Sequence, residues 1–341
     1  TSITRESLFN RFLRAGEWFR VMAMKLNPTP TRIKDRCILI VDASTVSKPG
    51  SVGMDYRLHY AMELSTMKCV HVEWTDKHGG ETLKRFPVRP QDLFVVDRGY
   101  SNAPGILHVI DNGGDVLVRL NPKSLPLYEK SGEPIAVYER VKDMREEEIR
   151  EWEIGIKRPN GERIPGRLLA YKIRLDQAQR AKRKAQRKAK RKKQGLSPEA
   201  LALHDYVLLW TTVGEEWSAQ ELLDLYRARW QIELVFKRMK SIMGLGDLLK
   251  FNPESAKAWL QGKLLLALIV EKLIERGDAR SEKKGVNHPR RSRWRETVLV
   301  YRELIFAIIP KLGLARMLEN WSLIITRLTE RKRKRKFQLI E

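Results

Sequence analysis

Two aspartates stand where apolar segments end, a position in which they could serve metal-dependent chemistry. Asp42 closes the run CILIVD, which begins at Cys37, and Asp97 closes the run LFVVD, which begins at Leu93. Both runs lack polar alternation, as expected of central strands that are covered on both faces. If the strands are neighbours, both carboxylates emerge close together, and such oxygen ligands suit Mg²⁺ or Mn²⁺. Taken singly, an aspartate after an apolar strand is more often a turn or a helix cap.

A second group of polar residues lies in the segment YRARWQIELVFKRMK. On one continuous helix with about 100° per residue, a single arc of about 60° holds Tyr226, Arg229, Glu233 and Lys240. Apolar residues occupy the side that would pack on a core, namely Ile232, Val235, Phe236 and Met239. The polar stripe could supply a metal ligand and several phosphate contacts. The alternative is an exposed face with ordinary pairing of Arg229 and Glu233.

The surrounding pattern predicts an α/β chain of about two domains. Residues 1–27 and the chain from Ser218 onward have helical periodicity, and strand-like segments lie between them. A β-rich stretch over residues 111–213 is interrupted by a basic segment that we expect to form a helix over 175–194. Its alanines recur every four residues, which leaves Lys and Arg on most of its surface.

The charge is concentrated in two places. The chain has 341 residues with 66 Lys+Arg and 42 Asp+Glu, a formal charge of +24. Residues 180–193 and 331–336 carry 16 of the basic residues and no acid, which favours a polyanionic partner, most economically nucleic acid. A solubilising helix and a disordered tail are the alternative. A hydrophobic content of 42% excludes a largely disordered polycation, and the two cysteines favour a reducing compartment.

Four segments together resemble a known family: DASTVSKPG, YRLHYAMEL, DRGY and YRARWQIELVFKRMK. They resemble DDE-type transposases of bacterial insertion sequences, specifically the insertion-sequence-4 type, whose signature is Y-x2-R-x3-E-x6-K. Tyr226, Arg229, Glu233 and Lys240 match that signature at every position.

The resemblance implies a ribonuclease-H-like mixed sheet flanked by helices and interrupted by a β-rich insertion domain. We expect a helical segment at 1–30, a catalytic domain at 31–110 and 214–330, the insertion domain at 111–213, and a basic tail at 331–341. The interval of 136 residues between Asp97 and Glu233 is too long for one link between a strand and a helix, so an insertion must fill it.

The resemblance also implies a mechanism. Asp42, Asp97 and Glu233 would be the catalytic residues and would hold two Mg²⁺ ions, for which Mn²⁺ can substitute. The expected reaction is cut-and-paste transposition, with hydrolysis at the element ends and attack of the freed 3′-OH on target DNA. The expected partners are the terminal inverted repeats and target duplex, bound by a homodimer on paired ends. The expected location is the bacterial cytoplasm at the nucleoid, with no membrane.

The expected DNA contacts lie on the signature helix and the basic segment: Tyr226, Arg229, Lys237, Lys240, Trp210, Arg183, Lys184, Arg187, Lys188 and Arg191. Relatives that form hairpin ends can carry a Trp early in the strand before the signature helix, where this chain has Val207. Trp210 is close by, but a buried core position is the alternative for it. Two other functions stay open, a metal-dependent nuclease that does not join DNA and a catalytically silent DNA-binding protein.

Overall fold

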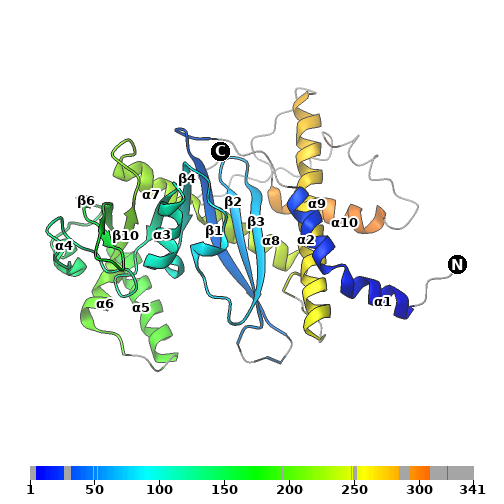
Figure 1. The fold of residues 1–341 in the computed structure, drawn as a ribbon, viewed down its shortest axis with the longest axis horizontal. Coiled ribbons are helices and arrows are strands. Elements are labelled where there is room, and N and C mark those ends of the chain that lie inside the picture. Colours follow the sequence, from blue (N-terminus) through cyan, green and yellow to red (C-terminus); the bar gives the residue numbers. More distant parts are fainter. Residues whose placement is uncertain are drawn as a thin grey trace. The chain divides into compact units, whose positions relative to one another are not determined.

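The chain divides into two compact units, each of which is described by itself. The structure is a computed structural model that describes residues 5–26, 32–48, 50–51, 53–191, 193, 195–246, 248, 252–283, 292–307 and 321. Unit 1 comprises residues 1–30, 43–80 and 230–341, and unit 2 comprises residues 31–42 and 81–229. Strand β1 (Cys37–Val46) contributes its first residues to unit 2 and its last to unit 1. Within unit 2 the hydrogen-bonded strands follow the order β1-β4-β5-β10-β9-β6, and within unit 1 β2 pairs with β3 (Figure 1).

Three parallel strands form the centre of unit 2. They are β1, β4 (Asp92–Val96) and β5 (Asp115–Arg119), and β4 pairs with both of the others. The five residues of β4 are all buried. This matches the sequence pattern, because parallel strands covered on both faces are apolar throughout.

Three antiparallel strands extend this sheet beyond β5. They are β10 (Tyr206–Thr211), β9 (Arg167–Lys172) and β6 (Ile149–Glu153), and a separate hairpin pairs β7 (Ile156–Lys157) with β8 (Arg163–Ile164). The β-rich stretch is therefore present, and its longer strands continue the central sheet. The expected domain boundary at residue 111 falls between β4 and β5, which the structure pairs as parallel neighbours.

Short helices and turns connect the strands of unit 2. Helix α3 begins after Asn102, whose side chain accepts a hydrogen bond from the Gly105 amide, as expected of an N-cap asparagine. The helical elements are η1 (Leu83–Arg85), η2 (Arg98–Tyr100), α3 (Ala103–Asp111), α4 (Val137–Val141), α5 (Leu175–Arg191), α6 (Pro198–Ala202), η3 (Leu203–Asp205) and α7 (Ala219–Ala228).

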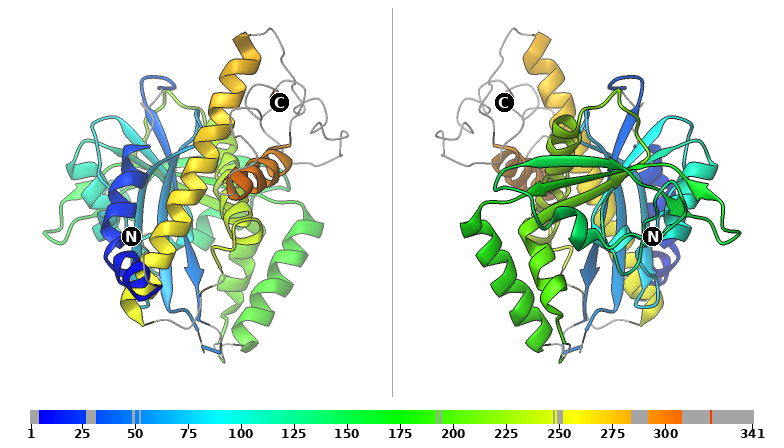
Figure 2. Two further views of the ribbon diagram at one scale, coloured as in Figure 1. Left: turned by 90° about the vertical axis from the view of Figure 1, so that its right-hand side faces the viewer. Right: turned by 90° about the vertical axis from the view of Figure 1, so that its left-hand side faces the viewer.

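Unit 1 combines a β-hairpin with helices. Strands β2 (Tyr56–Glu63) and β3 (Lys68–Asp76) are antiparallel. Helix α2 packs on α9, and both contact β3 (Figure 2). The helices are α1 (Arg5–Arg14), α2 (Gly16–Lys25), α8 (Trp230–Ser241), α9 (Pro253–Lys283) and α10 (Arg293–Ala307). No described helix is both long enough and apolar enough to cross a membrane.

Two helices predicted as continuous are each divided in the structure. The N-terminal helix is interrupted at Ala15, where the Gly16 backbone approaches Ala258 of α9 so closely that a Cβ atom at Gly16 would lie 3.4 Å from the Ala258 Cα. The signature helix is interrupted at Arg229, the C-cap of α7, and resumes as α8 at Trp230. The continuous helical arc from Tyr226 to Lys240 was therefore wrong. The basic tail at 331–341 lies outside the described residues.

Candidate active site

Asp42 and Asp97 lie side by side at one edge of the unit 2 sheet. The last residues paired between β1 and β4 are Val41 and Val96. Asp97 directly follows β4, whereas Asp42 is the next residue of β1, which continues to Val46, so the expectation that Asp42 ends its strand was wrong. Neighbouring strands lie about 4.8 Å apart, and residues in register on parallel strands project to the same face. The structure thus brings together the two aspartates that end the apolar runs.

Helix α7 supplies a partner for each carboxylate. The Tyr226 hydroxyl donates a hydrogen bond to Asp97 Oδ1 at 2.8 Å. Arg229, at the end of α7, forms an ion pair with Asp42 in which Nη1 lies 3.1 Å from Oδ2. The side chain of Arg229 is only 11% exposed and that of Asp42 only 21%. Both aspartates are therefore held in fixed orientations.

The sequence explains why α7 begins and packs where it does. Ser218 and Glu221 form a capping box, in which the Ser218 hydroxyl accepts from the Glu221 amide at 3.2 Å and the Glu221 carboxylate accepts from the Ser218 amide at 2.8 Å. Such a box satisfies two amides that the first helical turn leaves unpaired. The buried side of α7 consists of Leu222, Leu223 and Leu225.

The charges around Asp97 keep it ionised. Burial acts to raise the pKa of Asp97, but the positive charge of Arg229 and hydrogen bonds, including that from Tyr226, hold this pKa below its ordinary value. Burial and the neighbouring Asp97 raise the pKa of Tyr226. The phenol therefore stays protonated and acts as the donor, and Asp97 acts as the acceptor.

Glu233 and Lys240 belong to α8 in unit 1. The buried face of α8 carries the predicted apolar residues Ile232, Val235, Phe236 and Met239. Within unit 1, Lys240 Nζ donates to the carbonyl oxygen of Thr45 at 2.7 Å, and Thr45 lies three residues after Asp42 in β1. Burial lowers the pKa of Lys240. Glu233 belongs to unit 1 and the two aspartates belong to unit 2, so the assembly of the three carboxylates stays a prediction.

Trp210 is a core residue rather than an exposed DNA contact. Its side chain is fully buried, and its indole Nε1 donates to the carbonyl oxygen of Ile154 at 2.9 Å. The sequence left open whether Trp210 is a core residue or a DNA contact. The structure agrees with the core interpretation and not with the predicted DNA contact. Tyr206 is also buried, so neither ring offers a surface for stacking on a base.

Helix α5 presents its basic residues to solvent. The alanines face inward, with Ala178 buried, whereas the predicted DNA contacts on this helix are all exposed: Arg183, Lys184, Arg187, Lys188 and Arg191. None of these five forms an ion pair with a described residue. Lys182 attaches the helix to η3 through an ion pair with Asp205 at 2.7 Å. Lys237, on α8, is also exposed.

Arg119, which no sequence motif marked, lies beside Asp97 in the structure. Val96 pairs with Val118 across β4 and β5, so Arg119 is the next residue after the last paired position, as Asp97 is on β4. A signal was present, because Arg119 follows the apolar run VLV as Asp97 follows LFVV. Because the sequence does not reveal the order of the strands, that signal did not place Arg119 next to Asp97.

The donor chemistry of Asp42 and Asp97 fits a divalent cation. Mg²⁺ and Mn²⁺ prefer oxygen ligands, and magnesium sites in proteins commonly use one or two carboxylates. Among the described residues, no group of three or more His, Cys, Asp or Glu side chains is gathered as a metal site. The two aspartates therefore fit part of a ligand set.

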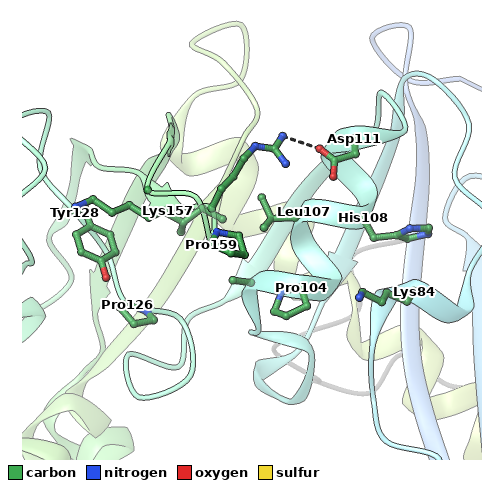
Figure 3. Close-up of a pocket in the computed structure, with 13 residues that line it drawn as sticks. Lys84, Pro104, Leu107, His108, Asp111, Pro126, Tyr128, Lys157 and Pro159 are labelled. Atoms are coloured by element: carbon green, nitrogen blue, oxygen red, sulfur yellow. Dashed lines mark hydrogen bonds and ion pairs between the residues drawn. The ribbon is translucent and has the colours of Figure 1, made fainter.

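A cavity of about 710 Å³ lies elsewhere in unit 2. Leu107 and His108 of α3 line one side, and Lys157 lies on another side with Tyr128 (Figure 3). None of the predicted site residues lines it. Its charges are partly neutralised, because Arg158 forms an ion pair with Asp111 at 2.6 Å.

Comparison with known proteins supplies independent information. The family model described as Transposase DDE domain matches residues 33–269. The chain is 29% identical over 279 residues to the putative transposase InsL for insertion sequence element IS186A of Escherichia coli strain K12, covering 79% of this chain and 75% of that protein. The identity and the coverage of both chains are the same for the transposase for insertion sequence element IS421 of Escherichia coli.

A solved structure has a similar fold. A piggyBac transposase in a synaptic complex with hairpin DNA aligns with a TM-score of 0.51 and 10% sequence identity, over 99% of this chain and 66% of that chain. The present chain thus spans just under two thirds of that protein. The likeness confirms the fold class, a ribonuclease-H-like mixed sheet flanked by helices.

The family match contains Asp42, Asp97 and the whole segment from Tyr226 to Lys240. The match therefore covers Asp42 and Asp97 together with the residues that pair with them, Arg229 and Tyr226. The chain belongs to the Transposase DDE domain family and is a DDE-type transposase of an insertion sequence, an enzyme of DNA strand cleavage and strand transfer.

Proposed function

We propose that this chain catalyses cut-and-paste transposition of the insertion-sequence-4 type. Water attacks the phosphorus at the element end and the bond to the 3′ oxygen breaks. The freed 3′-OH then attacks the phosphorus of a target phosphodiester, which joins the element to the target 5′ end and releases the target 3′-OH. The observation that carries the proposal is the register of Asp42 and Asp97, each of which is held by a signature residue at the end of α7.

The proposed cofactor is a pair of Mg²⁺ ions, for which Mn²⁺ substitutes. Asp42 and Asp97 would hold them together with Glu233, whose inclusion rests on the spacing of the signature. When bound, such ions activate the nucleophile and stabilise the leaving 3′ oxygen.

The protein groups around the carboxylates position the reacting strand. Arg229 orients Asp42, and Tyr226 orients Asp97, so that the oxygen ligands are preorganised. Partners of this kind commonly affect metal affinity or activity by about 10- to 100-fold. Arg229, Tyr226 and Lys240 are also the proposed contacts to phosphates, where charge-assisted hydrogen bonds are strong.

Double-stranded DNA is the proposed partner, both as terminal inverted repeats and as target. The exposed cations of α5 support this, because contacts to phosphates position a duplex without reading its sequence. Lys237 is a further proposed contact on α8. A homodimer would pair two element ends, and the enzyme would act at the bacterial nucleoid.

A hairpin intermediate is not part of the proposal. The strand that would carry a stacking Trp in hairpin-forming relatives is β10, which has Val207 at that position. The two aromatic residues nearest to it in β10, Tyr206 and Trp210, are buried. No exposed ring of β10 is therefore available to hold a flipped base.

The proposal is tested with a duplex that carries the element end, a supercoiled target plasmid, and Mg²⁺ or Mn²⁺. Cleavage that leaves a 3′-OH, followed by covalent joining of that end to the plasmid, is the expected result. Cut ends without joined products would identify a metal-dependent nuclease. Tight, salt-sensitive binding without any cleavage would identify a catalytically silent DNA-binding protein.

A further inference from the structure

Arg167, the first residue of β9, binds the loop that leads from β10 to α7. Its Nη1 atom donates to the carbonyl oxygen of Gly214 at 2.6 Å and to that of Trp217 at 2.8 Å, with a longer contact to that of Val213 at 3.5 Å. Its Nη2 atom pairs with the Glu151 carboxylate of β6. One guanidinium therefore connects the backbone of this loop to the antiparallel part of the sheet.

The side chain of Arg167 is enclosed by the protein, since only 11% of it is exposed. Its register explains this position, because Arg167 pairs with Thr211, the last residue of β10. The preceding Gly166 approaches β10 so closely that a Cβ atom there would lie 2.7 Å from the carbonyl oxygen of Thr211. A guanidinium enclosed in this way makes its contacts with the protein itself rather than with a DNA strand.

Two further cations hold the same loop from the segment before β1. Arg36 Nη2 lies 3.0 Å from Glu216 Oε1. Lys34 Nζ donates to the carbonyl oxygen of Glu216 at 3.2 Å and lies 4.7 Å from the centre of the Trp217 ring. The loop is therefore bound from the start of β1 as well as from Arg167 on β9.

This loop leads directly into the helix that supplies both partners of the aspartates. Ser218, the N-cap of α7, follows Trp217, and the other end of α7 carries Tyr226 and Arg229. Because a helix moves as a rigid body, a displacement of its first turn also displaces its last turn. A displacement of about 1 Å is enough to break a hydrogen bond such as the one between Tyr226 and Asp97.

We propose that Arg167 is a positioning residue for DNA cleavage, which fixes the start of α7 so that Tyr226 and Arg229 meet the two aspartates. The inference rests on the proposed catalytic role of Asp42 and Asp97. It extends the site to β9, a strand that carries no signature residue, and it requires no contact between Arg167 and DNA.

Single-turnover cleavage of bound DNA measures the effect on the rate. Arg167→Met keeps the length of the side chain and removes its donors, and Arg167→Lys keeps the charge without the planar fork. At saturating enzyme the rate should fall by about 10- to 100-fold in the Met variant and by a smaller factor in the Lys variant. DNA affinity and its salt dependence should stay at the wild-type values. Arg150→Met on β6 is the matched control, because Arg150 is paired with Glu148, and it should cleave at the wild-type rate.

Combination with Tyr226→Phe shows whether Arg167 acts through α7. Tyr226→Phe alone should slow cleavage by about 10-fold. In the Arg167→Met background it should slow cleavage by less than about twofold, because the hydrogen bond that it removes is already disturbed. A structural role that does not involve α7 would instead give losses that multiply.

Hydrogen exchange of the metal-free protein gives a readout that does not depend on activity. In Arg167→Met the amides of α7 should lose about tenfold in protection, whereas those of α3 should keep theirs. Thermal unfolding shows whether each variant is folded. If Arg167→Met does not fold, Arg167→Lys takes its place in all three measurements.

Cleavage at the wild-type rate by the folded variant would overturn the inference, as would losses that multiply with Tyr226→Phe or unchanged protection of α7. The proposed function would survive any of these results if wild type still cut and joined DNA with metal. Conversely, a wild type that never cuts DNA contradicts the proposed function, and the exchange experiment still tests whether Arg167 fixes α7.

Discussion

The carboxyl edge of the unit 2 sheet and helix α5 both carry many charges, but they hold them in opposite ways. At the sheet edge, Asp42 and Asp97 each have a partner on α7, and Arg229 is largely enclosed. On α5, five basic residues are exposed and form no ion pair with a described residue. In one region the charges are paired and partly enclosed, and in the other they are exposed to solvent.

This difference corresponds to two demands of DNA chemistry. Attack at a chosen phosphorus requires reacting groups held in position, because small misplacements cost large factors in rate. Holding a duplex requires only that cations lie close to its phosphates, since the attraction depends little on side-chain geometry. Substitutions at the sheet edge should therefore affect the rate of cleavage, and substitutions on α5 should affect affinity.

The largest effect is expected from Asp97→Asn, which removes one of the paired carboxylates. The rate of metal-dependent cleavage should fall by about 10³-fold or more. Loss of a group that stabilises charge in the transition state has effects of this size. DNA affinity should stay the same or rise, because one negative charge is removed. Gel-based cleavage and binding assays measure both, with Asp111→Asn on α3 as control. Residual metal-dependent cleavage near the wild-type rate would contradict the assignment.

A smaller effect is expected from Tyr226→Phe, which keeps the ring and removes the hydrogen bond to Asp97. The cleavage rate should fall by about 10-fold, at the lower end of effects seen for groups that orient ligands. Single-turnover kinetics on bound DNA measure it. Tyr138→Phe on α4 is the matched control and should cleave at the wild-type rate. Equal rates for the two variants would mean that the hydroxyl has no orienting role.

Neutralising α5 should weaken binding without changing cleavage of bound DNA. A variant with Gln at positions 183, 184, 187, 188 and 191 should lose about one unit of salt slope for each phosphate contact that is removed. Its single-turnover rate at saturating enzyme should match wild type. The double substitution Arg140→Gln with Lys142→Gln, in α4 and at its C-cap, is the control, since both basic residues pair with glutamates. An unchanged salt slope would make α5 a solvated surface only.

The smallest effect concerns the helix that supplies both partners. Ser218→Ala should lower the free energy of unfolding by about 1 kcal/mol through loss of the N-cap, as measured by urea denaturation.

Lys34 and Ser218 lower the pKa of Glu221 to about 2 from its ordinary value of 4.5. The stabilisation by Glu221 is therefore present above about pH 4.5 and lost as the pH falls toward 2. A Glu221→Gln variant should show a flatter acid limb, and an unaltered limb would contradict this role.

Local patterns were sufficient to predict much of the fold. The apolar runs that end at Asp42 and Asp97 form the first part of β1 and most of β4. The alanine spacing of α5 correctly predicted that Lys and Arg cover most of its surface. These features depend on residues near one another in the chain. The ribonuclease-H-like class came from the family resemblance and agrees with the solved structure.

Features that depend on distant contacts could not be predicted. The break at Arg229 has no Gly or Pro to mark it, and Arg229 itself has helical backbone angles. The burial of Trp210 depends on the Ile154 carbonyl, which lies 56 residues away. The position of Arg119 depends on β5 being the neighbour of β4, which no local pattern reveals.

Asp42, Asp97 and Glu233 are proposed to act together as the catalytic residues. The most direct test is nicking of a duplex carrying the element end with Mg²⁺ or Mn²⁺, comparing wild type, Glu233→Gln and the control Glu254→Gln on α9. Nicks that leave a 3′-OH are expected in wild type and in the control, and none are expected with Glu233→Gln. DNA binding should be unchanged in all three. Wild-type nicking by folded Glu233→Gln would contradict this proposal, because a carboxylate that can be lost without effect is not part of the catalytic site.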